Sequence, residues 1–106
     1  SDQPVQEEDI WEQLRTVYDP EIPVNIVELG LIYDLKIEQK KDGACVNVKM
    51  TLTAPGCGMG PVIAQDAELK LRNIPGVKDV LVEIVWEPLW GRDMMSDEAK
   101  LQLGMM

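Results

Sequence analysis

The sequence has no histidine, and this absence excludes a large part of ordinary enzyme chemistry. Histidine is the usual general base near neutral pH, a common zinc ligand and the partner of the nucleophile in Ser-His and Cys-His catalytic pairs. Only two cysteines are present, whereas a small secreted domain held together by disulfides normally carries about four or more. We therefore predict free thiols in a reducing compartment.

Positive charge is also scarce, because 10 Lys and Arg face 19 Asp and Glu and give a net charge of -9. Such a surface repels phosphate backbones and anionic lipid headgroups, so we expect neither nucleic acid nor a membrane as a partner. No apolar run approaches the ~18 residues of a transmembrane helix. The first residues are acidic, unlike a signal peptide. These features predict a cytoplasmic protein.

The composition that remains is typical of a globular protein, with 45% hydrophobic and 27% charged residues. A chain of 106 residues has room for one domain with one core, which we place at residues 1–106. A chain of this size buries only ~65% of its unfolded surface on folding. Its core is therefore small, and association with a partner is expected to stabilise it.

Hydrophobic periodicity predicts a helix over residues 7–18 and strands over 31–38, 44–53 and 78–87. The first helix carries its apolar stripe on Ile10, Trp11, Leu14, Val17 and Tyr18, and the third strand presents Val80, Val82, Ile84 and Trp86 to the core. A second helix begins at Pro61, and a short last helix runs between Ser96 and Gly104. Residues 19–30, with two prolines, are expected to form an ordered loop.

The predicted order is helix-strand-strand-helix-strand-short helix. Elements in this order predict an α+β two-layer sandwich, in which helices cover one face of a small sheet.

Cys57 is the first candidate for a functional residue. It lies among Gly56, Gly58 and Gly60, directly before the predicted second helix, where backbone N–H groups and the helix dipole favour a thiolate. The alternative interpretation is a small hydrophobic residue in a turn. Cys45 lies mid-strand among polar neighbours and is interpreted as an incidental surface or edge residue.

Four polar residues are candidates to support Cys57. Asp19 and Glu21 flank Pro20, so both carboxylates can point at one spot and accept hydrogen bonds or bind a cation. Asp19 can equally be a turn residue that bonds its own backbone. Thr51 and Thr53 share a strand face that ends beside the Cys57 loop, although threonine is also simply a good strand former.

Several motifs in this chain resemble one known family, the iron-sulfur cluster assembly domain shared by bacterial SufT proteins, PaaD and the eukaryotic cytosolic iron-sulfur targeting factor. The resemblance runs from Val17 to the C-terminus through residues 18–21, 27–34, 50–57, 74–77 and 86–90, followed by Met95-Ser96. Residues 57–61 look most like the long SufT form. We therefore expect the chain to correspond to the C-terminal domain of that form or to a shorter relative.

The resemblance implies a non-enzymatic maturation factor of metal-sulfur cluster biosynthesis that helps to deliver iron-sulfur clusters to apo-proteins. The family's prominent cysteine maps onto Cys57 and its acidic loop onto Asp19 and Glu21. The expected partners are iron-sulfur scaffold or carrier proteins, apo-protein clients and a second copy in a homodimer. A single cysteine cannot hold a cluster that needs about four thiolates, so a transient cluster or iron at Cys57 is expected, and no tightly bound cofactor.

Two other functions stay open. A thiol enzyme with Cys57 as nucleophile needs a base, and without histidine only Asp19 or Glu21 is available. An interaction scaffold without metal chemistry needs neither the thiol nor the carboxylates.

Overall fold

The computed structural model describes residues 5–19, 22–53 and 60–104. Its elements are α1 (Glu7–Leu14), β1 (Ile32–Lys40), β2 (Gly43–Met50), α2 (Gly60–Arg72), β3 (Val77–Ile84), a 3-10 turn (Arg92–Met94) and α3 (Asp97–Gln102). This is the predicted order of elements, and it confirms the α+β fold class.

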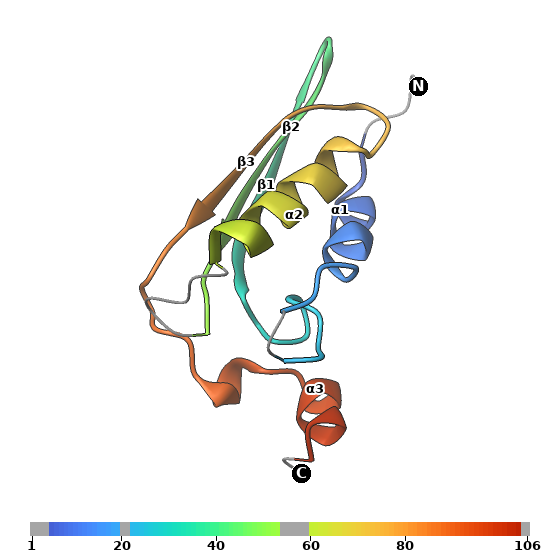
Figure 1. Cartoon of the computed structure of the whole chain (residues 1–106). Coiled ribbons are helices and arrows are strands. Elements are labelled where there is room, and N and C mark those ends of the chain that lie inside the picture. The colour runs from blue at the N-terminus through green and yellow to red at the C-terminus, as the bar shows by residue number, and fades with distance from the viewer. Residues whose placement is uncertain (1–4, 20–21, 54–59, 105–106) are drawn as a thin grey trace.

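The sheet is mixed, with the strand order β1-β2-β3. β1 and β2 form an antiparallel hairpin, whereas β3 runs parallel to β2 and is reached through α2. Both α1 and α2 lie on one face of the sheet (Figure 1), as predicted. The buried residues of β2, among them Val46, Val48 and Met50, pack with Leu14 of α1 and Leu71 of α2 into one core.

The first helix is shorter than predicted, since it ends at Leu14 rather than Tyr18. Beyond it the chain turns into an extended pairing, in which Ile26 N–H donates to Val17 O at 2.9 Å and Tyr18 forms an antiparallel bridge with Asn25. Val17 is buried, but Tyr18 is 56% exposed and does not belong to the core. A tertiary backbone pairing thus replaces the last turn that the hydrophobic period predicted.

The second and third strands also end early. β2 stops at Met50, although the Thr51 N–H still donates to Leu31 O at 2.8 Å and extends the pairing with the start of β1 by one residue. β3 stops at Ile84, and Trp86 beyond it is 40% exposed, so its placement on the core face was wrong. In β1 the register shifts between Ile32 and Asp34, which leaves Tyr33 out of the regular alternation.

The C-terminal segment packs on the loop before β1. Trp90 Nε1–H donates to Leu29 O at 2.7 Å, and Ser96 N–H donates to Glu28 O at 2.8 Å. The Ser96 hydroxyl caps α3 by accepting from Ala99 N–H, as predicted. α3 lies beyond the end of the sheet and not on its helix-covered face (Figure 1).

Candidate functional site

The candidate site lies at the carboxyl ends of β2 and β3. Because these strands are parallel and α2 connects them, their carboxyl ends and the start of α2 gather at one edge of the sheet (Figure 1). Residues 51–53 leave β2 here, and α2 begins at Gly60. Cys57 belongs to the connection between them in sequence, and both Cys57 and Glu21 lie outside the described residues.

Thr51 is fully buried, with 0% exposure, although it carries a hydroxyl. Its Oγ1 has no hydrogen-bond partner, and it is the one such buried side-chain atom in the described part of the chain. A buried hydroxyl without a partner carries a desolvation cost of about 1–3 kcal/mol. A valine would fill the same space without that cost, so stability alone does not explain a threonine here.

Tyr33 lies close to Thr51 but leaves the Thr51 hydroxyl without a hydrogen bond of normal geometry. The phenol proton has other acceptors, since Tyr33 Oη donates to Pro88 O at 2.8 Å and lies 3.3 Å from Met94 Sδ. Partial burial raises the pKa of the Tyr33 phenol, and a weak hydrogen-bonding interaction with the Thr51 hydroxyl, too poor in geometry to satisfy that group, offsets part of the rise. These two contacts hold the segment after β3 against the start of β1, beside Thr51.

Asp19 is the other buried polar residue among those described, with 6% exposure. Its Oδ1 accepts the Ile22 N–H at 3.2 Å, and its own N–H donates to Val24 O at 3.4 Å. The turn role that the sequence allowed for Asp19 is therefore present, since its carboxylate accepts from the backbone N–H three residues further on. Thr53, the remaining supporting residue, is half-buried.

A ladder of backbone hydrogen bonds connects the loop of Asp19 to Thr51. Ile26 N–H donates to Val17 O, Leu31 N–H to Ile26 O at 3.1 Å, and Thr51 N–H to Leu31 O. Residues 17–31 and Thr51 are thus held in one backbone framework at this end of the molecule. The grouping of Asp19, Glu21, Thr51 and Thr53 around Cys57 stays a prediction, since Glu21 and Cys57 lie outside the described residues.

Cys45 lies elsewhere, on the sheet face opposite the helices. It belongs to the central strand, so of its two interpretations, a surface or an edge residue, the edge residue was wrong. Its cross-strand neighbours are Glu38 of β1 and Asp79 of β3, and the thiol is half-buried between these strands. Asp79 is paired with Arg72 at 3.2 Å, and the Lys78 ammonium interacts electrostatically with the thiol, so the charges around Cys45 are mixed in sign.

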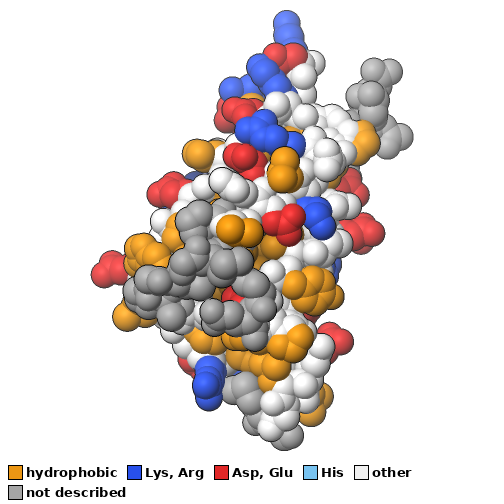
Figure 2. Space-filling model, in the orientation of Figure 1, with side chains coloured by type: hydrophobic (Ala, Val, Ile, Leu, Met, Phe, Trp, Pro, Cys, Tyr) orange, Lys and Arg blue, Asp and Glu red, His pale blue; other side chains and the backbone are white. Residues whose placement is uncertain are grey.

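Apolar side chains are exposed at the same end of the sheet as Thr51. They are Val62 in the first turn of α2 and Trp86 and Leu89 after β3, with exposures of 51%, 40% and 66%. Figure 2 shows hydrophobic side chains gathered over this half of the molecule. An apolar surface of this kind is typical of a contact with another protein.

Sequence reasoning missed Tyr33 and Met94. The register shift that singles out Tyr33 leaves no mark in the apolar alternation, and the Met94 contact depends on how residues 85–95 fold back.

Across residues 5–19, 22–53 and 60–104, no group of three or more Cys, Asp or Glu side chains is arranged to hold a metal ion. No helix in this part of the chain is long and apolar enough to span a bilayer.

Comparison with known proteins gives a consistent result. Residues 7–84 match the family model described as iron-sulfur cluster assembly protein. The chain is 51% identical over 100 residues to an Fe-S protein maturation auxiliary factor from Porphyromonas gingivalis, covering 94% of this chain and 92% of that protein. It is 47% identical to the Fe-S protein maturation auxiliary factor SufT of Staphylococcus aureus, covering 83% of this chain and 97% of that protein.

A solved structure shows the same fold. The crystal structure of a domain of unknown function, DUF59, from Bacillus anthracis superposes with a TM-score of 0.82 at 38% sequence identity, covering 94% of this chain and 92% of that one.

Proposed function

Because the chain belongs to the iron-sulfur cluster assembly protein family, we propose that it is a maturation factor that helps to deliver iron-sulfur clusters to apo-proteins. The match of residues 7–84 to that family carries the proposal. The Cys57 thiolate is the transient ligand or contact thiol in this proposal. The chain acts in the cytoplasm and without a catalytic reaction of its own.

The cluster, or iron, is cargo in this scheme and not a resident cofactor. An iron-sulfur cluster takes about four protein ligands, usually thiolates, and Cys57 supplies one. The remaining ligands come from a scaffold or carrier protein on one side and from the apo-protein client on the other. The exposed Val62, Trp86 and Leu89 support such contacts, since they flank the candidate site with apolar surface. A second copy in a homodimer is a further source of ligands.

The supporting residues have distinct roles in this proposal. Asp19 is held by its bond to Ile22 N–H, and Glu21 is the second acidic residue that the proposal assigns to this loop. Thr51 supplies a buried hydroxyl without a partner, which is available to a group that enters from the Cys57 side. Thr53 extends the same segment toward Cys57.

A transfer assay tests the function. The protein is reconstituted anaerobically with iron and sulfide, its absorbance is recorded, and an apo-protein is added whose activity depends on its cluster. We expect faster client activation with the protein than with free iron and sulfide alone. Client activation at the same rate without the protein would contradict the proposal.

A thiol enzyme is less well supported, because the family match and the names of the relatives point to maturation and not to turnover. Turnover of small thiol-reactive substrates is the observation that would favour it. A metal-free interaction scaffold would be favoured if a Cys57→Ser variant still matured its clients at the wild-type rate.

Thr51 offers a test that separates function from stability. In Thr51→Val the methyl groups keep the shape and the unpartnered hydroxyl disappears, so we expect stability to be unchanged or higher by about 1 kcal/mol. If the hydroxyl serves the cargo, cluster transfer falls by several-fold, and Thr51→Ser, which keeps the hydroxyl, restores it. Thermal melts and client activation measure both quantities. Equal transfer by the valine variant would show that the hydroxyl has no such role.

A further inference from the structure

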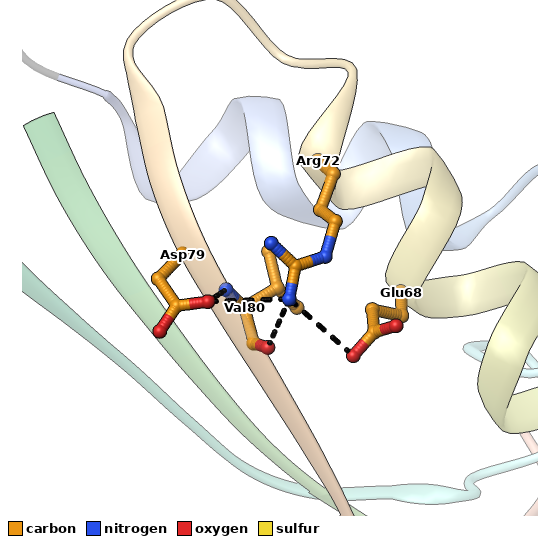
Figure 3. Close-up of polar contacts among 4 residues, drawn as sticks. All are labelled: Glu68, Arg72, Asp79 and Val80. Carbon is orange, nitrogen blue, oxygen red and sulfur yellow. Dashed lines mark hydrogen bonds and ion pairs between the residues drawn. The ribbon is translucent and has the colours of Figure 1, made fainter.

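The two free edges of the sheet differ, and the β3 edge is closed by side chains. Val80 N–H donates to Asp79 Oδ1 at 3.0 Å, and Val80 O accepts from Arg72 Nη2 at 3.2 Å (Figure 3). Arg72 itself pairs with Asp79 at 3.2 Å and lies 3.7 Å from Glu68. An added strand would have to displace this cluster from the middle of β3, so this edge is protected against pairing.

The β1 edge has no such protection in the part of the chain that the structure describes. Apart from the pairing with β2, no hydrogen bond from another described residue reaches the backbone of Ile32–Lys40; the segment before α1 contacts the strand through a side chain, since Gln39 Nε2–H donates to Val5 O at 2.8 Å. Lys36, Glu38, Gln39 and Lys40 are exposed, and the β1–β2 hairpin extends past the helices at one end of the molecule (Figure 1). A strand of nine residues with an open edge is a surface on which another strand can pair.

The charges of β1 complement themselves in an antiparallel pairing. Asp34, Lys36, Glu38 and Lys40 alternate along the sheet face opposite the helices. If two copies of β1 pair with Ile37 opposite Ile37, Asp34 faces Lys40 of the second copy and Lys36 faces Glu38. By symmetry each pair occurs twice, and every directly opposed charge meets the opposite sign. The half-buried Ile37 side chains meet on the other face.

Neighbouring registers that keep the same faces do not share this property. Centring the pairing on Lys36 opposes two lysines and sets Asp34 against Glu38, while centring it on Glu38 opposes two glutamates and sets Lys36 against Lys40. Like charges directly opposite each other destabilise a strand pair. The charge pattern therefore selects the register centred on Ile37.

We infer that β1 is the homodimer interface, through antiparallel pairing with the β1 strand of a second copy about a two-fold axis at Ile37. Two copies with a net charge of -9 each repel one another, but β1 is locally neutral, with two lysines and two carboxylates. The paired sheets form one continuous sheet with all helices on the same side.

The C-terminal aromatic and methionine residues are a weaker alternative for the dimer interface, because Met95 is buried and Trp90 is bonded to Leu29 O.

A charge swap tests the interface without any cluster, so its outcome is independent of the proposed function. Lys36→Glu sets a carboxylate against Glu38 of the second copy at both symmetry-related contacts, and we expect the dimer dissociation constant to rise by about tenfold or more. The double variant Lys36→Glu/Glu38→Lys restores both pairs and should return the constant to within about threefold of wild type. Arg92→Glu makes the same charge change at an exposed position outside the sheet and should have little effect. Sedimentation over micromolar to millimolar concentrations measures all four proteins.

Cross-linking tests the register. In a background with both native cysteines changed to serine, Ile37→Cys places two cysteines opposite each other, with their Cα atoms ~5.5 Å apart, inside the range of about 4.4–6.8 Å that a disulfide spans. Leu35→Cys offsets the thiols along the strand, too far apart to form a disulfide. We expect oxidation to yield a covalent dimer of the first variant and not of the second. A wild-type protein that stays monomeric, a double variant that fails to restore association, or preferential cross-linking at Leu35→Cys would each overturn the inference.

Discussion

Cys57→Ser is expected to lose most of the cluster transfer while the protein stays folded. Cluster iron binds a thiolate, and a serine hydroxyl stays protonated near neutral pH, so client activation should fall about tenfold or more. The position lies between glycines in sequence, and a serine is nearly as small as a cysteine. The free energy of unfolding is therefore expected to change by no more than about 1 kcal/mol.

Cys45→Ser is the matched control, because it removes the other thiol of the chain. Its position between Glu38 and Asp79, on the face away from the candidate site, predicts normal transfer. Thermal melts and client activation on both variants give the comparison. A Cys57→Ser protein that unfolds would make this cysteine structural, and one that transfers clusters at the wild-type rate would remove the thiol from the mechanism.

Alkylation rates provide a second readout of the same assignment. Single-cysteine variants treated with iodoacetate across a range of pH should show faster labelling at Cys57, which precedes α2, than at Cys45. Faster labelling at Cys45 would reverse the assignment.

The element order was predictable from the sequence because the signals that define it are local. Alternation of apolar residues identifies β1 and β2, proline and glycine punctuate the chain before α2, and Ser96 marks the start of α3. The errors fall where a distant segment competes for the backbone. Tyr18 pairs with Asn25, and this pairing is not visible in a local period.

Burial agrees with the sequence in singling out two candidate residues, while their role stays a prediction. Asp19, chosen beside Pro20, and Thr51, chosen in the strand before Cys57, are the two buried polar residues in the described ranges. Their connection through Val17, Ile26 and Leu31 depends on tertiary hydrogen bonds that no spacing rule predicts. The covering of Tyr33 by Pro88 and Met94 likewise requires contacts across more than fifty positions of the chain.

Gly30→Ala is expected to be the most destabilising substitution in the framework behind the site. Gly30 has a φ of +80°, a conformation that costs an L-residue roughly 1–2 kcal/mol. Its Cβ would also collide with the carbonyl oxygen of Met94 and lie 3.2 Å from Met94 Cβ. Because the obstacle is backbone, it cannot move aside without displacing the C-terminal segment from Leu29 and Glu28.

Gly104→Ala isolates the steric part of this effect. Gly104 has a similar φ of +74°, but a Cβ there would meet nothing within 4 Å, so its cost is the backbone conformation alone. We expect Gly30→Ala to lose about 3 kcal/mol or more, which corresponds to a fall in Tm of ~12 °C or more in a domain of this size. Gly104→Ala should lose no more than about half of that.

The C-terminal segment that Gly30→Ala displaces carries Pro88 and Met94. Gly30→Ala should therefore also free the Tyr33 phenol, raising its exposure and returning its pKa toward the ordinary value. Thermal melts together with ultraviolet titration of tyrosine measure both consequences, and equal Tm losses in the two variants would show that the close approach of Gly30 to Met94 does not hold the segment in place.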